Sequence, residues 1–365
     1  MDYSGRQRKL QVALAATRLD GLLISHLPNI RYLCGFTGSA GLLLVEPSGC
    51  SFFTDSRYGA QVREEAAGAR VVVSRGNIVA AIAERIGRRK GSGRRAARKT
   101  LGIEADHVTV AEKKRLAALL RPSHGLRDAP GLVEDARMVK DGDELAAIRA
   151  AVRLGAELFE TALAAIRPGV KEVEVAAAME YAARKIGAEE MSFPTIVASG
   201  ARSALPHGRA SNQPVPAGAF VVCDWGVILS GYCSDQTRTV WAGKQQAEAR
   251  AAYDAVLEAQ LAATDAVKPG ATVGEVDSAA RKVLRKAGLG RYFTHSTGHG
   301  VGIEIHEAPR VASGQTQELN PGMVITIEPG VYLPGKWGIR IEDMVAVTTQ
   351  GCEVLTPTSK KLVVR

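Results

Sequence analysis

The chain lacks long hydrophobic runs, is poor in aromatic residues and has no paired cysteines. No uninterrupted apolar segment reaches the ~18–20 residues needed to cross a bilayer, and the basic N-terminus is followed by no apolar segment or small-residue cleavage site. The five cysteines are scattered without a CxxC pair, which argues against a disulfide framework and a thiolate zinc site. We therefore expect a cytoplasmic protein with no membrane partner.

Acidic residues are outnumbered, 38 against 47 lysines and arginines, so the 365-residue chain has a formal net charge of +9. Seven of the basic residues lie in Arg88–Lys99 with no acid among them, which leaves only 9 − 7 = +2 for the rest. A nucleic-acid-binding protein more often spreads its basic charge over a face or a helix. Because glycines interrupt this segment, it is interpreted as a solvated surface loop, and a nucleic-acid partner is not expected.

Length and pattern indicate two domains. Strands alternating with helices predict an α/β domain over residues 1–130, ending in a stretch rich in proline and glycine, Arg121–Asp135. The second domain, 131–365, starts with a helix over Leu145–Ile166 that Asp141 or Asp143 caps. In the first domain we expect strands at Gly21–Ser25, Gly41–Val45, Ser51–Thr54 and Ala69–Val73, and helices at Gln7–Arg18 and Ile78–Arg88.

The second domain contains an internal sequence repeat. The motif that starts at Pro168-Gly169 and ends at Gly187 recurs 101 residues later, from Pro269-Gly270 to Gly288. Each copy reads as a helix end, a short loop and a second helix closed by glycine. Seven residues match at this one offset. Two unrelated helices with common caps are the alternative, but so many matches favour a duplicated half-domain. A site is then expected where the halves meet.

Two predicted hairpins each carry a pair of acids. A turn at Leu229-Ser230 would make Asp224 face Asp235 across the first hairpin, with Cβ atoms roughly 4.5–5.5 Å apart. A turn centred on Gly335 would make Glu328 face Glu342 across the second. A single acid in a strand is usually a solvent-facing charge. Two opposed pairs among valines and isoleucines instead predict a metal site, because a multivalent cation removes the repulsion.

Histidines supply the remaining candidate ligands. His295, His299 and His306 fall within twelve residues, around a glycine-rich run that allows close approach to a ligand. His207 lies in a loop-like context and could be structural or functional. Mostly oxygen ligands with one imidazole favour Mn²⁺, with Co²⁺, Zn²⁺ or Fe²⁺ as alternatives.

These motifs resemble the pita-bread metallopeptidases. The resemblance rests on Asp224-x-Gly226, Asp235-x-Thr237-Arg238, His299-Gly300-x-Gly302, Glu328-Pro329-Gly330 and Arg340-x-Glu342-Asp343. Two N-terminal stretches, Pro28–Tyr32 with Gly35–Ser39 and Phe53–Tyr58, are similar to the creatinase/prolidase-type N-terminal domain. The resemblance implies an α+β protein, with a duplicated pita-bread catalytic domain after a smaller α/β domain. It points to the branch of Xaa-Pro aminopeptidases (aminopeptidase P) and Xaa-Pro dipeptidases (prolidases).

The resemblance also assigns roles. It implies that two divalent metal ions are held by Asp224, Asp235, His299, Glu328 and Glu342, with Asp235 and Glu342 bridging both. Glu328 would also exchange a proton with the attacking water. His207 and His306 would stabilise the substrate carbonyl, His295 would support the site from behind, and Tyr332 and Arg340 would shape the substrate pocket.

The implied activity is that of a metallo-exopeptidase that cleaves an N-terminal residue from a following proline in peptide substrates. The sequence favours an Xaa-Pro aminopeptidase, with a dipeptidase as the alternative. A non-catalytic binding protein on this fold is disfavoured because all five ligand positions are intact. The family resemblance also implies a homodimer.

Overall fold

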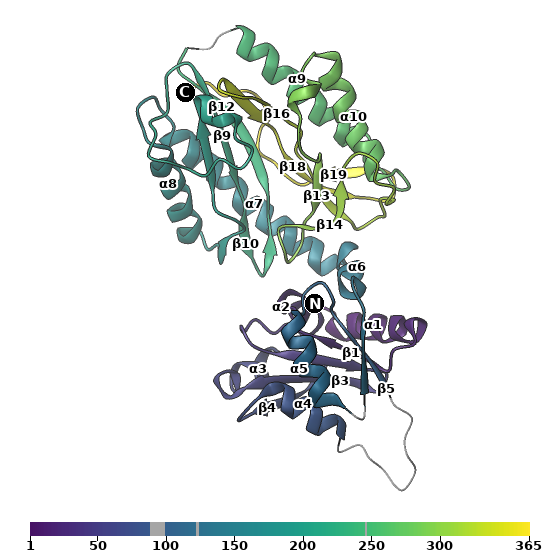
Figure 1. Cartoon of the computed structure of the whole chain (residues 1–365). Helices are drawn as coiled ribbons and strands as arrows, with labels where there is room; N and C mark the ends of the chain where they lie inside the picture. Colours follow the sequence, from purple (N-terminus) through teal and green to yellow (C-terminus); the bar gives the residue numbers. More distant parts are fainter. Residues whose placement is uncertain (88–98, 122–123, 245–246) are drawn as a thin grey trace. The chain divides into compact units, whose positions relative to one another are not determined.

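The structure, a computed structural model, describes residues 1–87, 99–121, 124–244 and 247–365 (Figure 1). It divides into two compact units, Met1–Arg137 and Met138–Arg365, whereas the sequence placed the boundary at residues 130/131. Of the basic stretch Arg88–Lys99, only Lys99 lies within the described residues. No helix in those residues is both long and apolar enough to span a membrane.

The first unit is built on a six-stranded mixed sheet in the order β4-β3-β2-β1-β5-β6 (Figure 1). Helices α4 and α5 share a core with the sheet through Ile82, Leu116 and Leu120, which pack with Leu23 and Phe53. The strands are β1 (Gly21–Ile24), β2 (Leu42–Glu46), β3 (Gly49–Asp55), β4 (Ala69–Ser74), β5 (Lys99–Ile103) and β6 (His124–Asp128). The helices are α1 (Tyr3–Thr17), α2 (Leu27–Cys34), α3 (Gln61–Glu65), α4 (Ile78–Gly87), α5 (Val110–Leu120) and α6 (Leu132–Met138).

The strands and helices predicted for this unit are all present, with ends shifted by a few residues. The stretch Arg121–Asp135 differs from expectation, because it contains an edge strand rather than only loop. β6 pairs in parallel with β5, from Lys99↔His124 to Ile103↔Asp128. Its residues have low strand propensity, so their conformation is set by pairing at the sheet edge, which no local pattern reveals.

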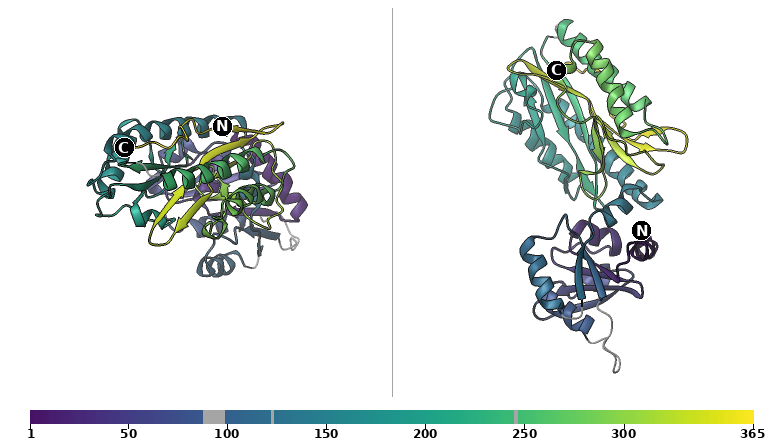
Figure 2. Two further views of the ribbon diagram at one scale, coloured as in Figure 1. Left: turned by 90° about the horizontal axis from the view of Figure 1, so that it is seen from above. Right: turned by 45° about the vertical axis from the view of Figure 1, so that its right-hand side comes forward.

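The second unit consists of two halves, each with a pair of helices followed by strands (Figures 1 and 2). Met179 packs with Val221 and Trp225 in the core of the first half. In the second half, Val256 packs with Ile325 and Val345. The first half contains α7 (Gly142–Ala165), α8 (Glu172–Lys185), β7 (Glu190–Met191), β8 (Ile196–Ser199), β9 (Ala219–Trp225), β10 (Val227–Leu229), β11 (Tyr232–Cys233) and β12 (Gln236–Ala242). The second contains α9 (Ala247–Asp265), α10 (Val273–Lys286), β13 (Gly298–Gly300), β14 (Glu307–Val311), β15 (Val324–Ile327), β16 (Gly330–Leu333), β17 (Trp337–Arg340), β18 (Asp343–Val347) and β19 (Cys352–Val354).

The duplicated fold predicted from the sequence repeat is confirmed. Both ends of α8 and of α10 are 101 residues apart. Gly169 and Gly270, which precede these helices, have φ of 89° and 80°, a left-handed conformation that glycine adopts without a steric penalty. Asp141 caps α7, and its carboxylate accepts from the amide of Glu144 as predicted.

The first hairpin corrects one prediction. The turn is formed by Ser230 and Gly231, which have φ of 51° and 76°, and not by Leu229-Ser230. Positive φ at both central residues is the requirement of a type I′ turn. The pairing therefore shifts by two residues, so that Asp224 faces Thr237 and the predicted direct pairing with Asp235 is wrong. Because side chains alternate with period two, the shift leaves both aspartates on one face.

The second hairpin has the predicted register. Ile327 pairs with Asp343 and Gly330 with Arg340, so paired residue numbers add to 670 in both ladders. Glu328 and Glu342 lie between these two ladders, where their amides bond elsewhere. The amide of Glu328 donates to Thr297 and that of Glu342 to Thr237. The bond from Glu328 thus stays next to β13, in the same sheet as β15, and the bond from Glu342 links the hairpin to β12 of the neighbouring three-stranded sheet.

Candidate metal centre

The four acids lie where strands end or change partner. Asp224 is the penultimate residue of β9, and Asp235 lies between β11 and β12. Glu328 directly follows β15, and Glu342 lies between β17 and β18. The backbone leaves regular pairing at Asp235, Glu328 and Glu342. Asp224 stays paired with Thr237 and Ile196 near the end of β9, so the other three carboxylates can converge on the volume beside it instead of projecting from a flat sheet.

His299 closes this group from β13. An atom of Asp235, one of His299 and one of Glu342 all lie within 4.8 Å of one another. His299 Nε2 is 3.6 Å from Asp235 Oδ2 and 3.5 Å from Glu328 Oε1. Its Nδ1–H donates to the carbonyl of Gly300 at 2.9 Å. The tautomer that makes this bond leaves Nε2 with a lone pair aimed at the acids, as a metal-ligating imidazole requires.

The ionised forms of these buried acids need a compensating positive charge. Burial, then the neighbouring Glu342, raises the pKa of Asp235 well above its usual value. Burial, then Glu328, does the same for the pKa of Glu342. The pKa of Glu328 is raised to about 7, chiefly by burial. When ionised, these carboxylates repel one another and have lost their hydration. A divalent cation would offset both the repulsion and the cost of desolvation.

Asp224 supplies a direct test of whether a cation fits. Its Oδ2 accepts from Arg340 Nη2 at 2.5 Å, while its Oδ1 is buried and has no hydrogen-bond partner. A buried carboxylate oxygen without a partner is costly, and a coordinated cation would satisfy it. The donor set of carboxylates and one imidazole therefore fits divalent metal ions.

Arg340 and Thr237 tie the acids to one another. Arg340 is buried and, besides Asp224, donates from Nε to Thr237 Oγ1 at 3.1 Å and from Nη1 to Tyr332 Oη at 2.7 Å. Thr237 Oγ1 in turn donates to Glu342 Oε2 at 2.7 Å. Such hydrogen bonds fix the orientation of ligand side chains. Thr237 was quoted in a motif but given no role from sequence, because its role depends on a contact across two strands.

His295 is partly buried and contacts Tyr332. Its Nδ1–H donates to the carbonyl of Ser296 at 2.8 Å, so its Nε2 accepts from Tyr332 Oη at 2.9 Å. Burial, then the charge of Arg340, lowers the pKa of His295 to about 4. The imidazole is therefore neutral at neutral pH, and it fixes the hydroxyl that Arg340 also contacts.

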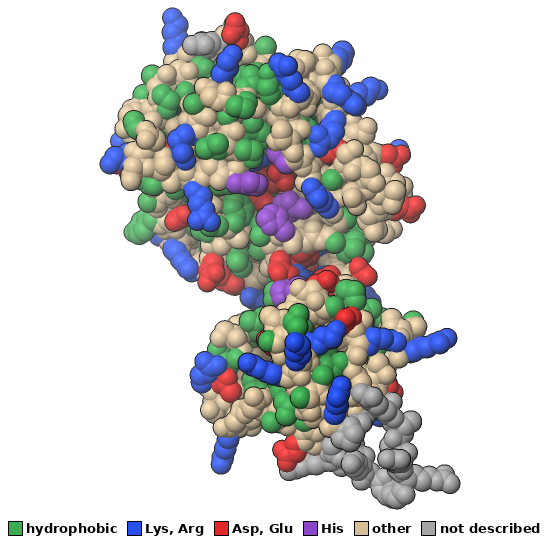
Figure 3. Space-filling model, in the orientation of Figure 1, with side chains coloured by type: hydrophobic (Ala, Val, Ile, Leu, Met, Phe, Trp, Pro, Cys, Tyr) green, Lys and Arg blue, Asp and Glu red, His purple; other side chains and the backbone are tan. Residues whose placement is uncertain are grey.

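His207 and His306 line the cavity in front of the acids, which has a volume of about 230 Å³. Figure 3 shows histidine side chains grouped around acidic ones in a hollow of this unit. The ring of His306 contacts that of His299 edge to face, with centroids 4.5 Å apart. The cavity thus gathers the five predicted ligands, both outer histidines and Arg340. Its other lining residues are Phe193, Pro194, Ile196, Arg209 and Ile305. None of them was predicted as a site residue, although Ile305 lies within the histidine-rich run 295–306.

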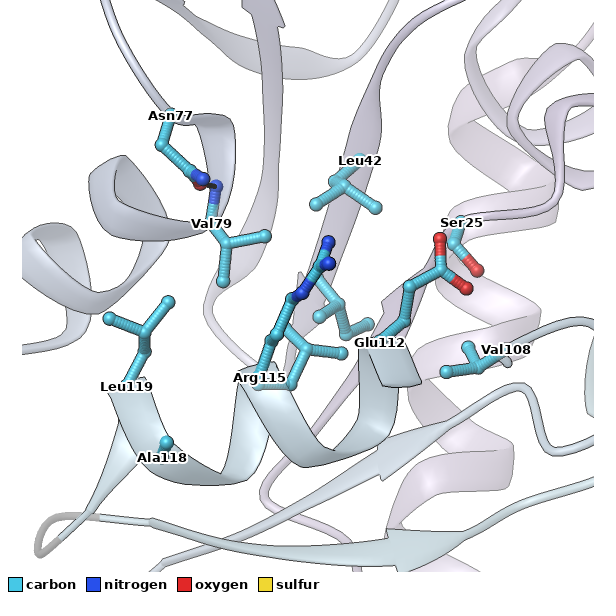
Figure 4. A pocket seen from close by; sticks show the side chains of 11 residues that line it. Ser25, Leu42, Asn77, Val79, Val108, Glu112, Arg115, Ala118 and Leu119 are labelled. Atoms are coloured by element: carbon cyan, nitrogen blue, oxygen red, sulfur yellow. Dashed lines mark hydrogen bonds between the residues drawn. The ribbon is translucent and has the colours of Figure 1, made fainter. Parts of the chain in front are cut away.

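A larger cavity, of about 460 Å³, lies in the first unit between α4 and α5 (Figure 4). Its walls are mainly aliphatic, and Glu112 and Arg115 are its charged side chains. Glu112 already accepts from Thr109 in the capping box of α5. Among the described residues its lining includes neither a histidine nor a second acid, so its size does not make it the candidate catalytic centre.

The comparisons with known proteins agree with this geometry. Residues 146–349, which include every predicted site residue, match metallopeptidase family M24, and residues 6–139 match the creatinase/prolidase N-terminal domain. The chain belongs to metallopeptidase family M24. The predicted enzyme class, a metallo-exopeptidase, is confirmed, and the family implies divalent metal ions.

Three relatives show how far the similarity extends. The chain is 36% identical to an Xaa-Pro dipeptidase of Pyrococcus horikoshii over 94% of its own length and 95% of the relative's. A solved Xaa-Pro dipeptidase from Bacillus anthracis superposes with a TM-score of 0.94 at 38% identity and covers 100% of both chains. An X-Pro aminopeptidase from Thermotoga maritima has a TM-score of 0.87 at 36% identity and covers 95% of this chain and 98% of its own. Both kinds of exopeptidase thus share the whole architecture.

Proposed function

We propose that this family member hydrolyses the bond between an N-terminal residue and a following proline, with dipeptides as its substrates. The observation that carries the proposal is the convergence of Asp235, His299 and Glu342 within 4.8 Å, beside Asp224 with its unpartnered oxygen. Similarity to Xaa-Pro dipeptidases over nearly the full length supports the substrate class.

Two divalent ions would be held by Asp224, Asp235, His299, Glu328 and Glu342, with Asp235 and Glu342 shared between them. When bound, such ions lower the pKa of water to near neutrality and polarise a carbonyl oxygen. We infer Mn²⁺ as the resident metal because oxygen ligands dominate, with Co²⁺, Zn²⁺ and Fe²⁺ as alternatives.

The chain's own residues would handle protons and charge. Glu328, whose carboxyl is largely buried beside the other acids, would exchange a proton with the attacking water, as a general base and acid must. His207 and His306, at the mouth of the cavity, would donate hydrogen bonds to the carbonyl oxygen as it gains negative charge. Removing one such donor typically costs about 10²–10³ in rate.

Tyr332 and Arg340 would shape the pocket from behind, with His295 as their support. Arg340 already donates to Asp224, Thr237, Tyr332 and the carbonyl of Pro206, so its charge serves the site and not the substrate. Proline has no N–H and leaves from a tertiary amide, so its nitrogen must receive a proton, and Glu328 is the group placed to return the one it accepted.

Substrate length depends on what lies at the outer end of the cavity. Arg209 lines the cavity, is exposed and makes no side-chain hydrogen bond within the residues described, so it is available to the carboxylate of a dipeptide. The cavity volume of about 230 Å³ is below the roughly 300–1,000 Å³ of common ligand pockets, which favours short substrates. The sequence had ranked the aminopeptidase first; Arg209 and the relatives favour the dipeptidase.

An Xaa-Pro aminopeptidase is the second candidate, supported by the similarity to the Thermotoga maritima enzyme. The deciding assay compares Ala-Pro with Gly-Pro-Ala in the presence of Mn²⁺. Release of proline from Ala-Pro alone supports the dipeptidase, and cleavage of Gly-Pro-Ala at a similar rate supports the aminopeptidase. We also infer a homodimer from the family resemblance, and a cytoplasmic location from the scattered cysteines. Light scattering of the purified protein would give twice the 38.6 kDa chain mass.

A further inference from the structure

Glu172, the first residue of α8, is a fully buried acid outside the metal centre. Its Oε1 accepts from the amide of Ser199 at 2.7 Å and from the hydroxyl of the same residue at 2.9 Å. Its Oε2 accepts from the amide of Ser211 at 3.1 Å, from its hydroxyl at 2.7 Å, and from Arg202 Nε at 3.0 Å. One carboxylate thus ties together both ends of the segment 199–211.

That segment carries His207 to the cavity. His207 is exposed and its side chain makes no hydrogen bond in the part of the chain that the structure describes, so its position depends on the backbone that presents it. Two further contacts brace this backbone. Arg202 Nη2 donates to the carbonyl of Arg209 at 2.7 Å, and Arg340 Nη1 donates to the carbonyl of Pro206 at 2.9 Å.

We propose that Glu172 is a positioning residue that places His207 for its contact with the substrate carbonyl. The inference rests on the proposed function, in which His207 stabilises the developing negative charge. Five donors converge on one ionised group, and hydrogen bonds to a charged acceptor are roughly twice as strong as neutral ones. An amide at this place could accept through one oxygen only, and its NH₂ group would face donors at the other end of the segment.

The second half contains a comparable device. Asp277 on α10 is fully buried and accepts from Arg281 Nε at 2.7 Å and from Thr297 Oγ1 at 2.8 Å. Arg281 also donates to the carbonyls of Phe293 and His295. This acid therefore braces the segment that carries His295, and no hydrogen bond among the described residues joins it to the segment of His207. Asp277→Asn is a matched control, since it removes the same kind of buried charge.

The test is a double-mutant cycle on kcat for Ala-Pro in the Mn²⁺-loaded full-length protein. Glu172→Gln alone is expected to lower kcat about tenfold to a hundredfold, the usual effect of losing a supporting hydrogen-bond partner. In a His207→Ala background the same change is expected to lower kcat less than twofold, because the group it positions is already absent. Asp277→Asn should lower kcat by similar factors in both backgrounds.

Equal loss from Glu172→Gln in both backgrounds would overturn the inference, because a general structural defect is additive with His207→Ala. Should Glu172→Gln fail to fold, Ser211→Ala replaces it. That change removes one of the five hydrogen bonds, and it is expected to show the same dependence on His207 with a smaller factor.

A second readout needs no metal and no substrate. Hydrogen exchange of the amides of Ser199 and Ser211 should accelerate in Glu172→Gln while exchange at Thr297 is unchanged. Unchanged protection at both serines would contradict the positioning role even if kcat fell. If the wild type does not cleave Ala-Pro, the proposed function fails, and the exchange experiment still decides whether Glu172 holds the segment.

Discussion

Arg340 Nη2 lies 2.5 Å from Asp224 Oδ2, and this contact makes the environments of the two carboxylate oxygens different. Oδ2 accepts a hydrogen bond from the buried guanidinium of Arg340. The other oxygen, Oδ1, is buried and has no hydrogen-bond partner. The arginine therefore fixes the rotamer of Asp224 and leaves one oxygen directed at the space that the other acids share. We therefore expect Arg340 to affect metal affinity by orienting Asp224.

Replacing Arg340 by methionine should weaken Mn²⁺ binding by about tenfold to a hundredfold, because Asp224 loses the hydrogen bond that orients it. It should also lower the free energy of unfolding of the metal-free protein by about 3–5 kcal/mol, because one partner of a buried ion pair is removed. Arg340→Lys keeps the charge without the fork of donors and should give smaller losses. Calorimetric titration and urea unfolding measure the two effects. Wild-type affinity in Arg340→Met would contradict this role.

Asp235→Ala tests the ligand that we propose both metal ions share. We expect loss of Mn²⁺ binding and of Ala-Pro hydrolysis, with the metal-free fold retained, because a buried carboxylate that its neighbours repel is removed. Metal analysis after gel filtration and the thermal transition of the metal-free protein check both statements. Asp254→Ala, which removes a half-exposed acid on α9, is the control and should bind metal normally. Retained activity in Asp235→Ala would refute the site.

His295 should make the metal-free protein sensitive to mild acid. Its pKa is lowered to about 4 from 6.5, so between these values the unfolded chain binds a proton that the folded protein does not. Stability from this group is present above pH 6.5 and is lost as the pH falls towards 4, by roughly 3 kcal/mol at most. Urea midpoints at pH 7 and pH 4.5 should fall more for the wild type than for His295→Gln. Equal decreases would contradict the assignment.

Arg209 should determine the preference for a free carboxylate. Arg209→Ala is expected to raise KM for Ala-Pro about tenfold, the loss of one charged hydrogen bond at an exposed site. KM for Ala-Pro amide, which has no carboxylate, should stay unchanged. Arg310, which pairs with His299 across β13 and β14 but does not line the cavity, supplies the control Arg310→Ala. A selective effect in that control instead would place the carboxylate elsewhere.

Much of the catalytic unit could be predicted because its signals are local. Prolines, glycines and caps fix the ends of α8 and α10, and the second hairpin follows from a turn at Gly335, whose φ is 73°. The first hairpin was misplaced although Ser230-Gly231 is a common turn dipeptide. The two-residue error changed which residue faces Asp224 without changing its face, so the grouping of the acids survived.

The remaining features depend on contacts that no local pattern contains. Thr237 reaches Glu342 across two strands, and Glu172 holds a segment some thirty residues away through one carboxylate. Arg209 becomes a candidate because its loop lies at the cavity, and no charge pattern distinguishes it from other arginines. Sequence motifs identified the groups proposed to meet the metal, while the residues that orient them required the fold.

The central claim is metal-dependent hydrolysis of an Xaa-Pro bond, and release of proline from Ala-Pro tests it most directly. The protein is stripped with a chelator and assayed before and after addition of Mn²⁺. We predict no release from the stripped protein and restored release with Mn²⁺. Folded protein that releases no proline with Mn²⁺, Co²⁺, Zn²⁺ or Fe²⁺, or that is equally active without metal, would contradict the claim.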